Sequence, residues 1–112
     1  MPGLSVVMIV RNEAACLGEC LESVGAIAQE MVVGDTGSTD DTVSVAEWHG
    51  ARVLSIPWHD DFSEASNLVL AEATGDWILH LDADEVVDPE SARQIRELVD
   101  AEQRASQEWL QR

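Results

Sequence analysis

Two aspartates stand two residues apart where an apolar run ends. The run 77–81 closes with Leu81, and Asp82, Asp84 and Glu85 follow it. Carboxylates this close repel each other, and a divalent cation between them removes the conflict. Hard oxygen ligands at a strand end also suit a cation that binds phosphates, and a diphosphate then completes its coordination. Alone, the same acids fit a solvated turn, so the other loops of the chain bear on the choice.

Polar residues follow the three earlier apolar runs as well. The sets are Arg11, Asn12 and Glu13 after the first run, 35–39 after the second, and 58–61 after the third. Ligands of an open parallel sheet bind beyond the carboxyl ends of its strands. Four polar strand ends on one edge are harder to explain as solvated surface than any one of them. Local alternatives stay open, since Glu13 also suits a helix N-terminus and Asp35 also suits a turn.

These loops depend on an alternation of strand and helix patterns. Strands are expected at 4–10, 30–34, 51–56 and 77–81, and helices at 14–24, 40–49, 62–73 and 89–111. The first run is apolar throughout, which is typical of a strand buried on both faces. Strands that alternate with helices imply a parallel sheet with right-handed crossovers. The chain is therefore predicted to be an α/β domain, a Rossmann-like half.

Capping patterns mark three helix starts. We interpret Ser38-x-x-Asp41 as a capping box, Asp61-x-x-Glu64 as a similar one, and Asp88 as an N-cap before Pro89. Asp60 is assigned with Asp61 to capping rather than to ligand binding. His59 and His80 are poor candidates for catalysis, and His80 is expected to have a structural role in or beside the sheet.

The last helix is predicted to be long. It would contain about 23 residues and extend roughly 34 Å. Its apolar stripe consists of Ala92, Ile95, Leu98 and Val99, and then thins to Ala101, Ala105, Trp109 and Leu110. We expect this tail to fray or to self-associate.

Composition limits the class of protein. A chain of 112 residues suits one domain, and its net charge of −16 argues against nucleic acid and anionic lipid as partners. An anionic ligand would need a metal ion or helix N-termini. The apolar runs are far shorter than the ~20 residues of a membrane span. No basic segment of a signal peptide precedes the first strand, so the expected location is the cytoplasm.

The two cysteines are interpreted as core residues. Cys16 and Cys20 lie four residues apart, on a helix stripe with Leu17, Leu21 and Val24. Reduced cysteines in such a stripe behave as small apolar side chains. No metal site is predicted there.

Four motifs occur in a fixed order along the chain. They are 9–13 (Ile-Val-Arg-Asn-Glu), 32–40 (Val-Val-Gly-Asp-Thr-Gly-Ser-Thr-Asp), 61–67 (Asp-Phe-Ser-Glu-Ala-Ser-Asn) and 75–85, which contains Asp-Ala-Asp. In this order, and roughly at this spacing, they resemble the family 2 glycosyltransferases of the GT-A fold. The resemblance covers Leu4 to about Leu98. It implies the strand order 3-2-1-4, flanking helices, and a crevice between the first and fourth strands.

The resemblance also implies a ligand and the residues that bind it. The ligand would be a nucleotide-sugar donor linked to UDP or GDP. Asp35 would hydrogen-bond the base or the ribose, and Asp82 and Asp84 would position Mg²⁺ or Mn²⁺ on the diphosphate, with Asp84 favoured over Asp82 as the direct ligand. The donor-binding residues would be Arg11, Asn12, Glu13, Asp35, Asn67 and Asp82.

Two departures from the family pattern affect the expected activity. The family usually has an arginine just before the asparagine of the third motif, and this chain has Ser66 there. In the family, the acceptor half and the catalytic base also lie C-terminal to Asp-x-Asp. In this chain the acids after Asp88 have the pattern of a solvated helix face, and none of them resembles that base. The chain is therefore expected to be one apparently truncated domain, 1–112. It would bind donor as part of a hexosyltransferase-like enzyme and be inactive or weakly active alone.

Two other functions are considered. One is a non-catalytic module that assembles through its last helix or through the sheet edge beside the fourth strand, as a homodimer or with a partner chain. The other is a small metal-dependent phosphoryl-transfer or nuclease domain, Toprim-like, which combines an early glutamate with a later Asp-x-Asp. The scarcity of Lys and Arg argues against this second function.

Overall fold

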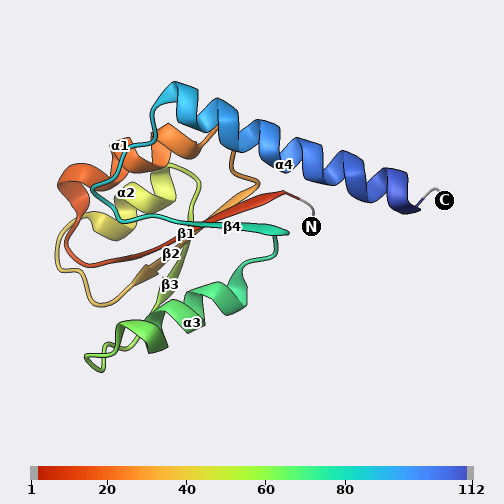
Figure 1. Cartoon of the computed structure of the whole chain (residues 1–112). Helices are drawn as coiled ribbons and strands as arrows, with labels where there is room; N and C mark the ends of the chain where they lie inside the picture. Colours follow the sequence, from red (N-terminus) through yellow and green to blue (C-terminus); the bar gives the residue numbers. More distant parts are fainter. Residues whose placement is uncertain (1–2, 111–112) are drawn as a thin grey trace.

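The computed structural model describes residues 3–110, and the backbone alone for 105–110 (Figure 1). Strands and helices alternate along the chain in the order β1 (Leu4–Val10), α1 (Ala14–Val24), β2 (Glu30–Asp35), α2 (Thr42–Trp48), β3 (Arg52–Ser55), α3 (Phe62–Glu72), β4 (Trp77–His80) and α4 (Pro89–Leu110). Each element lies within two residues of its predicted bounds. Residue 111, the predicted end of the last helix, lies outside the described residues.

The four strands form one parallel sheet in the order β3-β2-β1-β4. This confirms the α/β class and the strand order 3-2-1-4. Val6 in β1 is paired with Met31 in β2 and with Leu79 in β4. Six of the seven residues of β1 are buried, because this strand has neighbours on both sides and helices on both faces. That position explains its unbroken apolar run.

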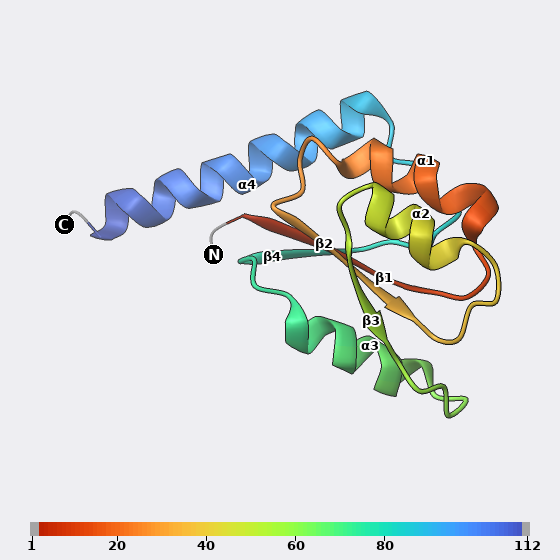
Figure 2. The ribbon, with the colours of Figure 1, turned by 180° about the vertical axis from the view of Figure 1, so that it is seen from behind.

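Helices cover both faces of the sheet. Figures 1 and 2 show α1, α2 and α4 on one face and α3 on the other. Side chains alternate along β1, so Met8 joins the core under α1 together with Leu17, while Val7 joins a smaller core with Val69 of α3. The two cores hold the strands in one position relative to the helices. The loops at the strand ends are fixed as a consequence.

Gly34 allows α3 and β3 to approach the end of β2. A Cβ atom at this position would lie 2.5 Å from Val69 Cγ2 and closer still to Ile56 Cδ1. Real side chains do not pack at such distances, so a larger residue would push α3 away. Gly34 immediately precedes Asp35, and its close packing therefore fixes the start of the second loop.

The helix caps agree with the sequence patterns at two of three helices. Glu64 N–H donates to Asp61 Oδ1 at 3.1 Å, and Ser91 N–H donates to Asp88 Oδ1 at 2.8 Å, as predicted. The capping box at Ser38 and Asp41 is wrong. Helix α2 begins at Thr42, whose N–H donates to Asp40 Oδ1 at 2.9 Å. Ser38 is not a cap, because its hydroxyl is engaged with the loop after β1.

Helix α4 packs through a narrower face than predicted. Val99 is buried and Ala92 and Ile95 are half-buried, but Leu98 is 62% exposed, so its place in the buried stripe is wrong. The helix then extends beyond the sheet (Figure 1). Of the predicted tail, Ala101 is exposed. The side chains of Ala105, Trp109 and Leu110 lie outside the described residues.

Among the described residues, no strand pairs with the outer side of the edge strand β4, and its Trp77 and Ile78 are exposed. Association through this edge stays a prediction. His80 also lies on β4, where its ring stacks on Phe62 with 5.9 Å between the ring centres. Within residues 3–110, no helix has both the length and the apolar content of a membrane-crossing segment.

Candidate functional site

The loops after β1 and β2 are joined at the carboxyl edge of the sheet. Asn12 has a φ of 53°, in the left-handed region that asparagine tolerates. Its side-chain Oδ1 accepts hydrogen bonds from Thr39 N–H at 2.7 Å and from Asp40 N–H at 3.3 Å. Its backbone N–H donates to Ser38 Oγ at 2.8 Å. One residue of the first loop therefore fixes three residues of the second.

A second set of bonds joins the starts of α1 and α2. Glu13 N–H donates to Thr42 Oγ1 at 2.8 Å, and Ala14 N–H donates to Asp40 Oδ2 at 3.3 Å. Helix α1 has no side-chain cap from its own N-cap residue, so Thr42 at the start of α2 and Asp40 in the loop before it supply acceptors for these N–H groups. The hydrogen bond from the Thr42 hydroxyl is the main cause that lowers the pKa of Asp40.

Asp35 is held inside its loop. Its side chain is largely buried at the end of β2, and its carboxylate accepts from Gly37 N–H at 3.3 Å and from Ser38 N–H at 3.2 Å. Ser38 Oγ donates to Asp35 Oδ1 at 2.5 Å. Gly37 closes this turn with a φ of 116°, which favours glycine. The Asp35 carboxylate therefore has a fixed orientation before any ligand arrives.

The loop after β4 presents its aspartates outward. Asp82 and Asp84 are exposed, while Ala83 between them is buried. Asp82 N–H donates to Glu85 Oε1 at 2.7 Å, and Glu85 N–H donates to Asp82 O at 2.9 Å. These reciprocal bonds close a tight turn. Both predicted metal ligands therefore face solvent at the carboxyl edge.

Helix α1 is hydrogen-bonded to this loop at two points. Cys20 Sγ–H donates to Asp82 O at 3.6 Å, and Val87 N–H donates to Ser23 Oγ at 3.0 Å. Cys20 is fully buried, and Cys16 is half-buried; both are free thiols. Burial, with the nearby charge of Glu85 next, raises the pKa of Cys20 to about 11. The thiols are therefore neutral at pH 7, as expected for core residues.

Acids of two loops affect the thiol of Cys16. Burial raises the pKa of this thiol first, and its hydrogen bond to Glu13 and the negative charges of Glu13 and Asp84 raise it further. The bond from Cys16 Sγ to Glu13 Oε2 is 3.2 Å. Acids from the loops after β1 and β4 thus act on one thiol.

The loop after β3 is separate from this network. Trp58 Nε1–H donates to Asp60 Oδ1 at 3.1 Å, and His59 Nδ1 lies 2.7 Å from Glu64 Oε1. These bonds are local to the loop and the start of α3. Arg11 and Asn67 are exposed, and among the described residues neither takes part in the hydrogen bonds that join the loops.

The predicted metal ligands are compatible with a divalent cation. Asp82 and Asp84 supply exposed hard oxygen donors, which Mg²⁺ and Mn²⁺ prefer. In the part of the chain that the structure describes, no three His, Cys, Asp or Glu side chains gather into a metal-binding group. The remaining ligands of a cation would therefore be water and phosphate oxygens, as is usual for Mg²⁺.

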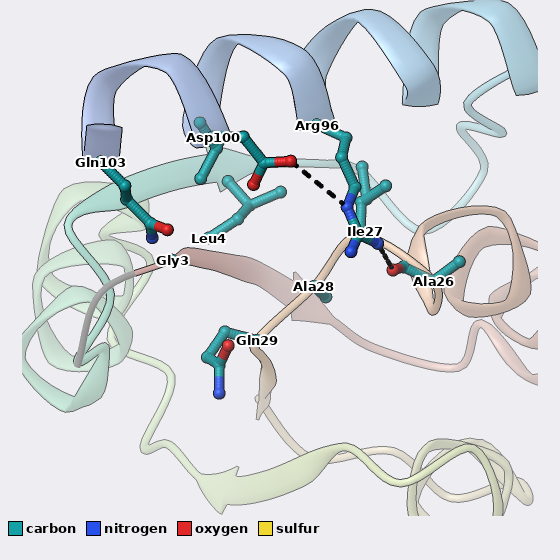
Figure 3. Close-up of a pocket in the computed structure, with 10 residues that line it drawn as sticks. Gly3, Leu4, Ala26, Ile27, Ala28, Gln29, Arg96, Asp100 and Gln103 are labelled. Carbon is teal, nitrogen blue, oxygen red and sulfur yellow. Dashed lines mark hydrogen bonds and ion pairs between the residues drawn. The ribbon is translucent and has the colours of Figure 1, made fainter. Parts of the chain in front are cut away.

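A cavity of about 280 Å³ lies at the opposite, amino edge of the sheet. Figure 3 shows it between α4 and the segment 26–29, where Arg96 Nη1 donates to Ala26 O at 2.8 Å. Arg96 also pairs with Asp100 at 3.8 Å. The bond to Ala26 docks α4 onto the domain, whereas the pair with Asp100 lies within the helix. The cavity has no contact with the loops described above.

Three residues of the site were not identified from the sequence: Ser38 as a loop bridge, Thr42 and Cys20. Ser38 and Thr42 each accept a bond from a residue more than 25 positions away, and local spacing patterns contain no such information. One pattern could have identified Thr42. A hydroxyl at a helix start that faces the core needs a hydrogen-bond partner.

Comparisons with known proteins agree with this arrangement. The chain matches Glycosyl transferase family 2 over residues 5–109. A TPR repeat-containing protein of Synechococcus elongatus is 48% identical over 100 residues, which cover 89% of this chain and 25% of that protein. The crystal structure of S. aureus TarS has the same fold, with a TM-score of 0.76 and 23% identity over 88% of this chain and 32% of that one.

A third comparison is with a structure that contains ligands. Glucosyl-3-phosphoglycerate synthase from Mycobacterium tuberculosis, in complex with Mn²⁺ and UDP-glucose, has a TM-score of 0.66 and 33% identity, over 75% of this chain and 34% of that one. The chain thus spans between a quarter and about a third of the length of these three proteins. The match over nearly its whole length shows that the chain belongs to glycosyl transferase family 2.

Proposed function

We propose that this chain is the nucleotide-sugar-binding part of a metal-dependent glycosyltransferase. The observation that carries the proposal is the family match over residues 5–109. The mycobacterial synthase in complex with Mn²⁺ and UDP-glucose supports a UDP-linked donor, and a GDP-linked donor is the alternative. The donor would lie along the carboxyl edge, over the loops after β1, β2 and β4.

Asp82 and Asp84 would hold Mg²⁺ or Mn²⁺ at this edge. The chain carries 22 acidic and 6 basic residues, so its own side chains would repel a diphosphate. When bound, the cation would stabilise the negative charge that develops on the diphosphate as the sugar leaves. The tight turn between Asp82 and Glu85 keeps both aspartates turned toward solvent, where a metal–diphosphate can reach them.

The nucleoside would be bound by the loops after β1 and β2. Asp35 has an oriented carboxylate that can accept from N–H or O–H groups of the base or ribose. Arg11, Asn12 and Glu13 would line the same part of the donor, and Asn67 would approach it from α3. Arg11 is exposed, so its guanidinium is free to contact a phosphate.

We further propose that the 112 residues form one donor-binding domain that alone transfers little or no sugar. An inverting transfer needs a base that takes the proton of the acceptor hydroxyl. Three of the acids that follow Asp88 are paired on α4: Glu90 and Glu97 pair with Arg93, and Asp100 pairs with Arg96. None of these pairs is arranged to serve as such a base, so the acceptor groups would come from other residues.

Calorimetric titration of the 112-residue chain with UDP and with GDP tests the proposal. Each nucleotide is titrated with and without Mn²⁺. We expect one nucleotide to bind only when Mn²⁺ is present, and the double variant Asp82→Ala/Asp84→Ala to lose at least tenfold in affinity. Loss of both carboxylates removes the direct protein ligands of the cation.

The matched control is Glu47→Ala/Glu102→Ala. Both glutamates are exposed, on α2 and α4, and their loss changes the net charge by the same amount. This control should bind as the unaltered chain does. If a folded unaltered chain binds neither nucleotide, the donor-binding function is rejected, and a non-catalytic assembly module with its exposed β4 edge becomes the better explanation.

A further inference from the structure

A chain of hydrogen bonds connects Asn12 to the Asp35 carboxylate. Asn12 N–H donates to Ser38 Oγ at 2.8 Å, and the Ser38 hydroxyl donates to Asp35 Oδ1 at 2.5 Å. Because Ser38 Oγ accepts the first bond, its single proton is left for the second. The direction of the hydroxyl is therefore fixed by a residue that lies 26 positions earlier in the sequence.

We propose that Asn12 and Ser38 are positioning residues that orient Asp35 toward the nucleoside of the donor. This inference rests on the proposed function, since it assigns a task to the site that binds the donor. Asp35 would make the contact itself. Besides lining the donor, Asn12 would act on it through Ser38 and Asp35, because its amide oxygen already accepts from Thr39 and Asp40 N–H.

The backbone of Asn12 explains why an asparagine suits this position. Its φ is 53°, and asparagine adopts this region more readily than other non-glycine residues. The same geometry places Oδ1 on two N–H groups of the second loop. An alanine there would lose the side-chain bonds to Thr39 and Asp40 and would also disfavour the left-handed φ of this position.

The chain of hydrogen bonds from Asn12 through Ser38 ends at the side chain of Asp35. This side chain is largely buried, and only a small part of its surface can meet a ligand. A carboxylate with so little exposed surface can contact a ligand in only one direction, and three donors hold it there: Gly37 N–H, Ser38 N–H and the Ser38 hydroxyl. Loss of the hydroxyl of Ser38 would remove the shortest of these bonds and leave the two N–H donors.

The test compares two ligands on the same variants. UDP and GDP carry a base and a ribose, whereas pyrophosphate with Mn²⁺ carries only the phosphates. We expect Ser38→Ala and Asn12→Ala each to weaken binding of the preferred nucleotide roughly tenfold. Binding of Mn²⁺–pyrophosphate should stay within about twofold of the unaltered chain, because Asp82 and Asp84 lie on another loop.

A double-variant cycle shows whether Ser38 acts through Asp35. In a chain that carries Asp35→Ala, adding Ser38→Ala should change nucleotide affinity by less than about twofold. Should Asp35→Ala fail to fold, Ser38→Thr replaces it in the test. Threonine keeps the hydroxyl and should bind the nucleotide within about threefold of the unaltered chain. Ser91→Ala, at the start of α4, is the matched serine control and should leave nucleotide affinity unchanged.

Three results overturn the inference, and they are distinct. If Ser38→Ala binds the nucleotide as tightly as the unaltered chain, Asp35 needs no positioning. If Ser38→Ala weakens nucleotide and pyrophosphate equally, the hydroxyl only supports the loops. If the unaltered chain binds neither UDP nor GDP, the proposed function itself is rejected, and this inference falls with it.

Discussion

Ser66 is the single residue at which a gain in donor affinity is expected. It lies half-buried on α3, beside Asn67, where the family pattern usually has an arginine. An arginine there would add a cation to a chain with a net charge of −16. We predict that Ser66→Arg binds UDP or GDP with Mn²⁺ about three- to tenfold more tightly at low salt, measured by calorimetry. The gain should shrink at high salt because the charges are then screened.

The control for this prediction is Ser44→Arg on α2. Ser44 is exposed, and the substitution changes the net charge by the same amount, away from α3. An equal gain for both variants would show that overall charge matters and that position does not. A gain confined to Ser66→Arg would support the donor path over the start of α3.

The residues of the candidate site were predicted, but their partners were not. Asn12, Asp35 and Asp82 follow predicted strands, which placed them at one edge of the sheet, and the family resemblance gave them their expected roles. The bond from Asn12 to Ser38 joins residues 26 positions apart, and it arises only when β1 and β2 pair in the sheet. Ser38 was interpreted as a helix cap because it stands three residues before Asp41, which is the spacing of a capping box. A spacing pattern of this kind contains no information about partners in other loops.

At the scale of elements, the buried face of α4 includes Val99 and excludes its neighbour Leu98. Ala92, Ile95 and Val99 repeat at helical spacing and lie toward the sheet, whereas Leu98 points outward and is 62% exposed. Both Leu98 and Val99 are apolar, so the sequence pattern alone could not separate them. The outcome was decided by how α4 docks on α1 and on the segment 26–29, through Val99 and Arg96.

This docking gives a matched pair of variants. Val99→Ala should lower the free energy of unfolding by about 1–2 kcal/mol, because it removes buried methyl groups. Leu98→Ala removes a larger side chain and should change it by less than about 0.5 kcal/mol, because that side chain is mostly in water already. Urea unfolding followed by circular dichroism measures both. A larger loss for Leu98→Ala than for Val99→Ala would contradict the observed face of α4.

The bounds of the other elements were predictable for physical reasons. The bounds of β1 and α1 agree with the sequence patterns at both ends, since an apolar strand and an amphipathic helix carry strong periodic patterns. Helix α2 is shorter than expected, 42–48 in place of 40–49. Its first two predicted residues, Asp40 and Asp41, belong to the loop that Asn12 and Ala14 hold. A contact between loops therefore set the start of this helix.

At the scale of the whole molecule, the carboxyl and amino ends of the strands differ in what they carry. The carboxyl edge carries the candidate site, and the amino edge carries a network centred on Glu30. Glu30 Oε2 accepts from Ser5 Oγ at 2.6 Å and from Thr74 N–H at 2.5 Å, and Gly75 N–H donates to Ser5 Oγ at 2.8 Å. Arg52 lies 3.8 Å from Glu30 Oε1. This network joins the amino ends of all four strands.

The protonation of Glu30 links this network to pH. Partial burial by itself raises the pKa of the carboxyl, but hydrogen bonds from Ser5 and Thr74, with the nearby Arg52 guanidinium, outweigh it and lower the pKa below its usual value. A carboxyl whose pKa is lower in the folded state stabilises that state above its unfolded pKa of about 4.3. The stabilisation is lost as pH falls through the lower, folded value.

Glu30→Gln should therefore have a lower free energy of unfolding than the unaltered chain at neutral pH, and nearly the same free energy of unfolding in acid. We expect a loss of about 1–2 kcal/mol at pH 7, since the amide keeps the shape of the side chain but accepts weaker bonds. The difference should shrink as pH falls below about 4.3, because a protonated Glu30 resembles a glutamine. Glu72→Gln, which affects only the exposed end of the Arg52 pair, should lose less than about 0.5 kcal/mol. Urea unfolding across this pH range measures both variants, and a loss for Glu30→Gln that stays constant into acid would show that its charge does not stabilise the amino edge.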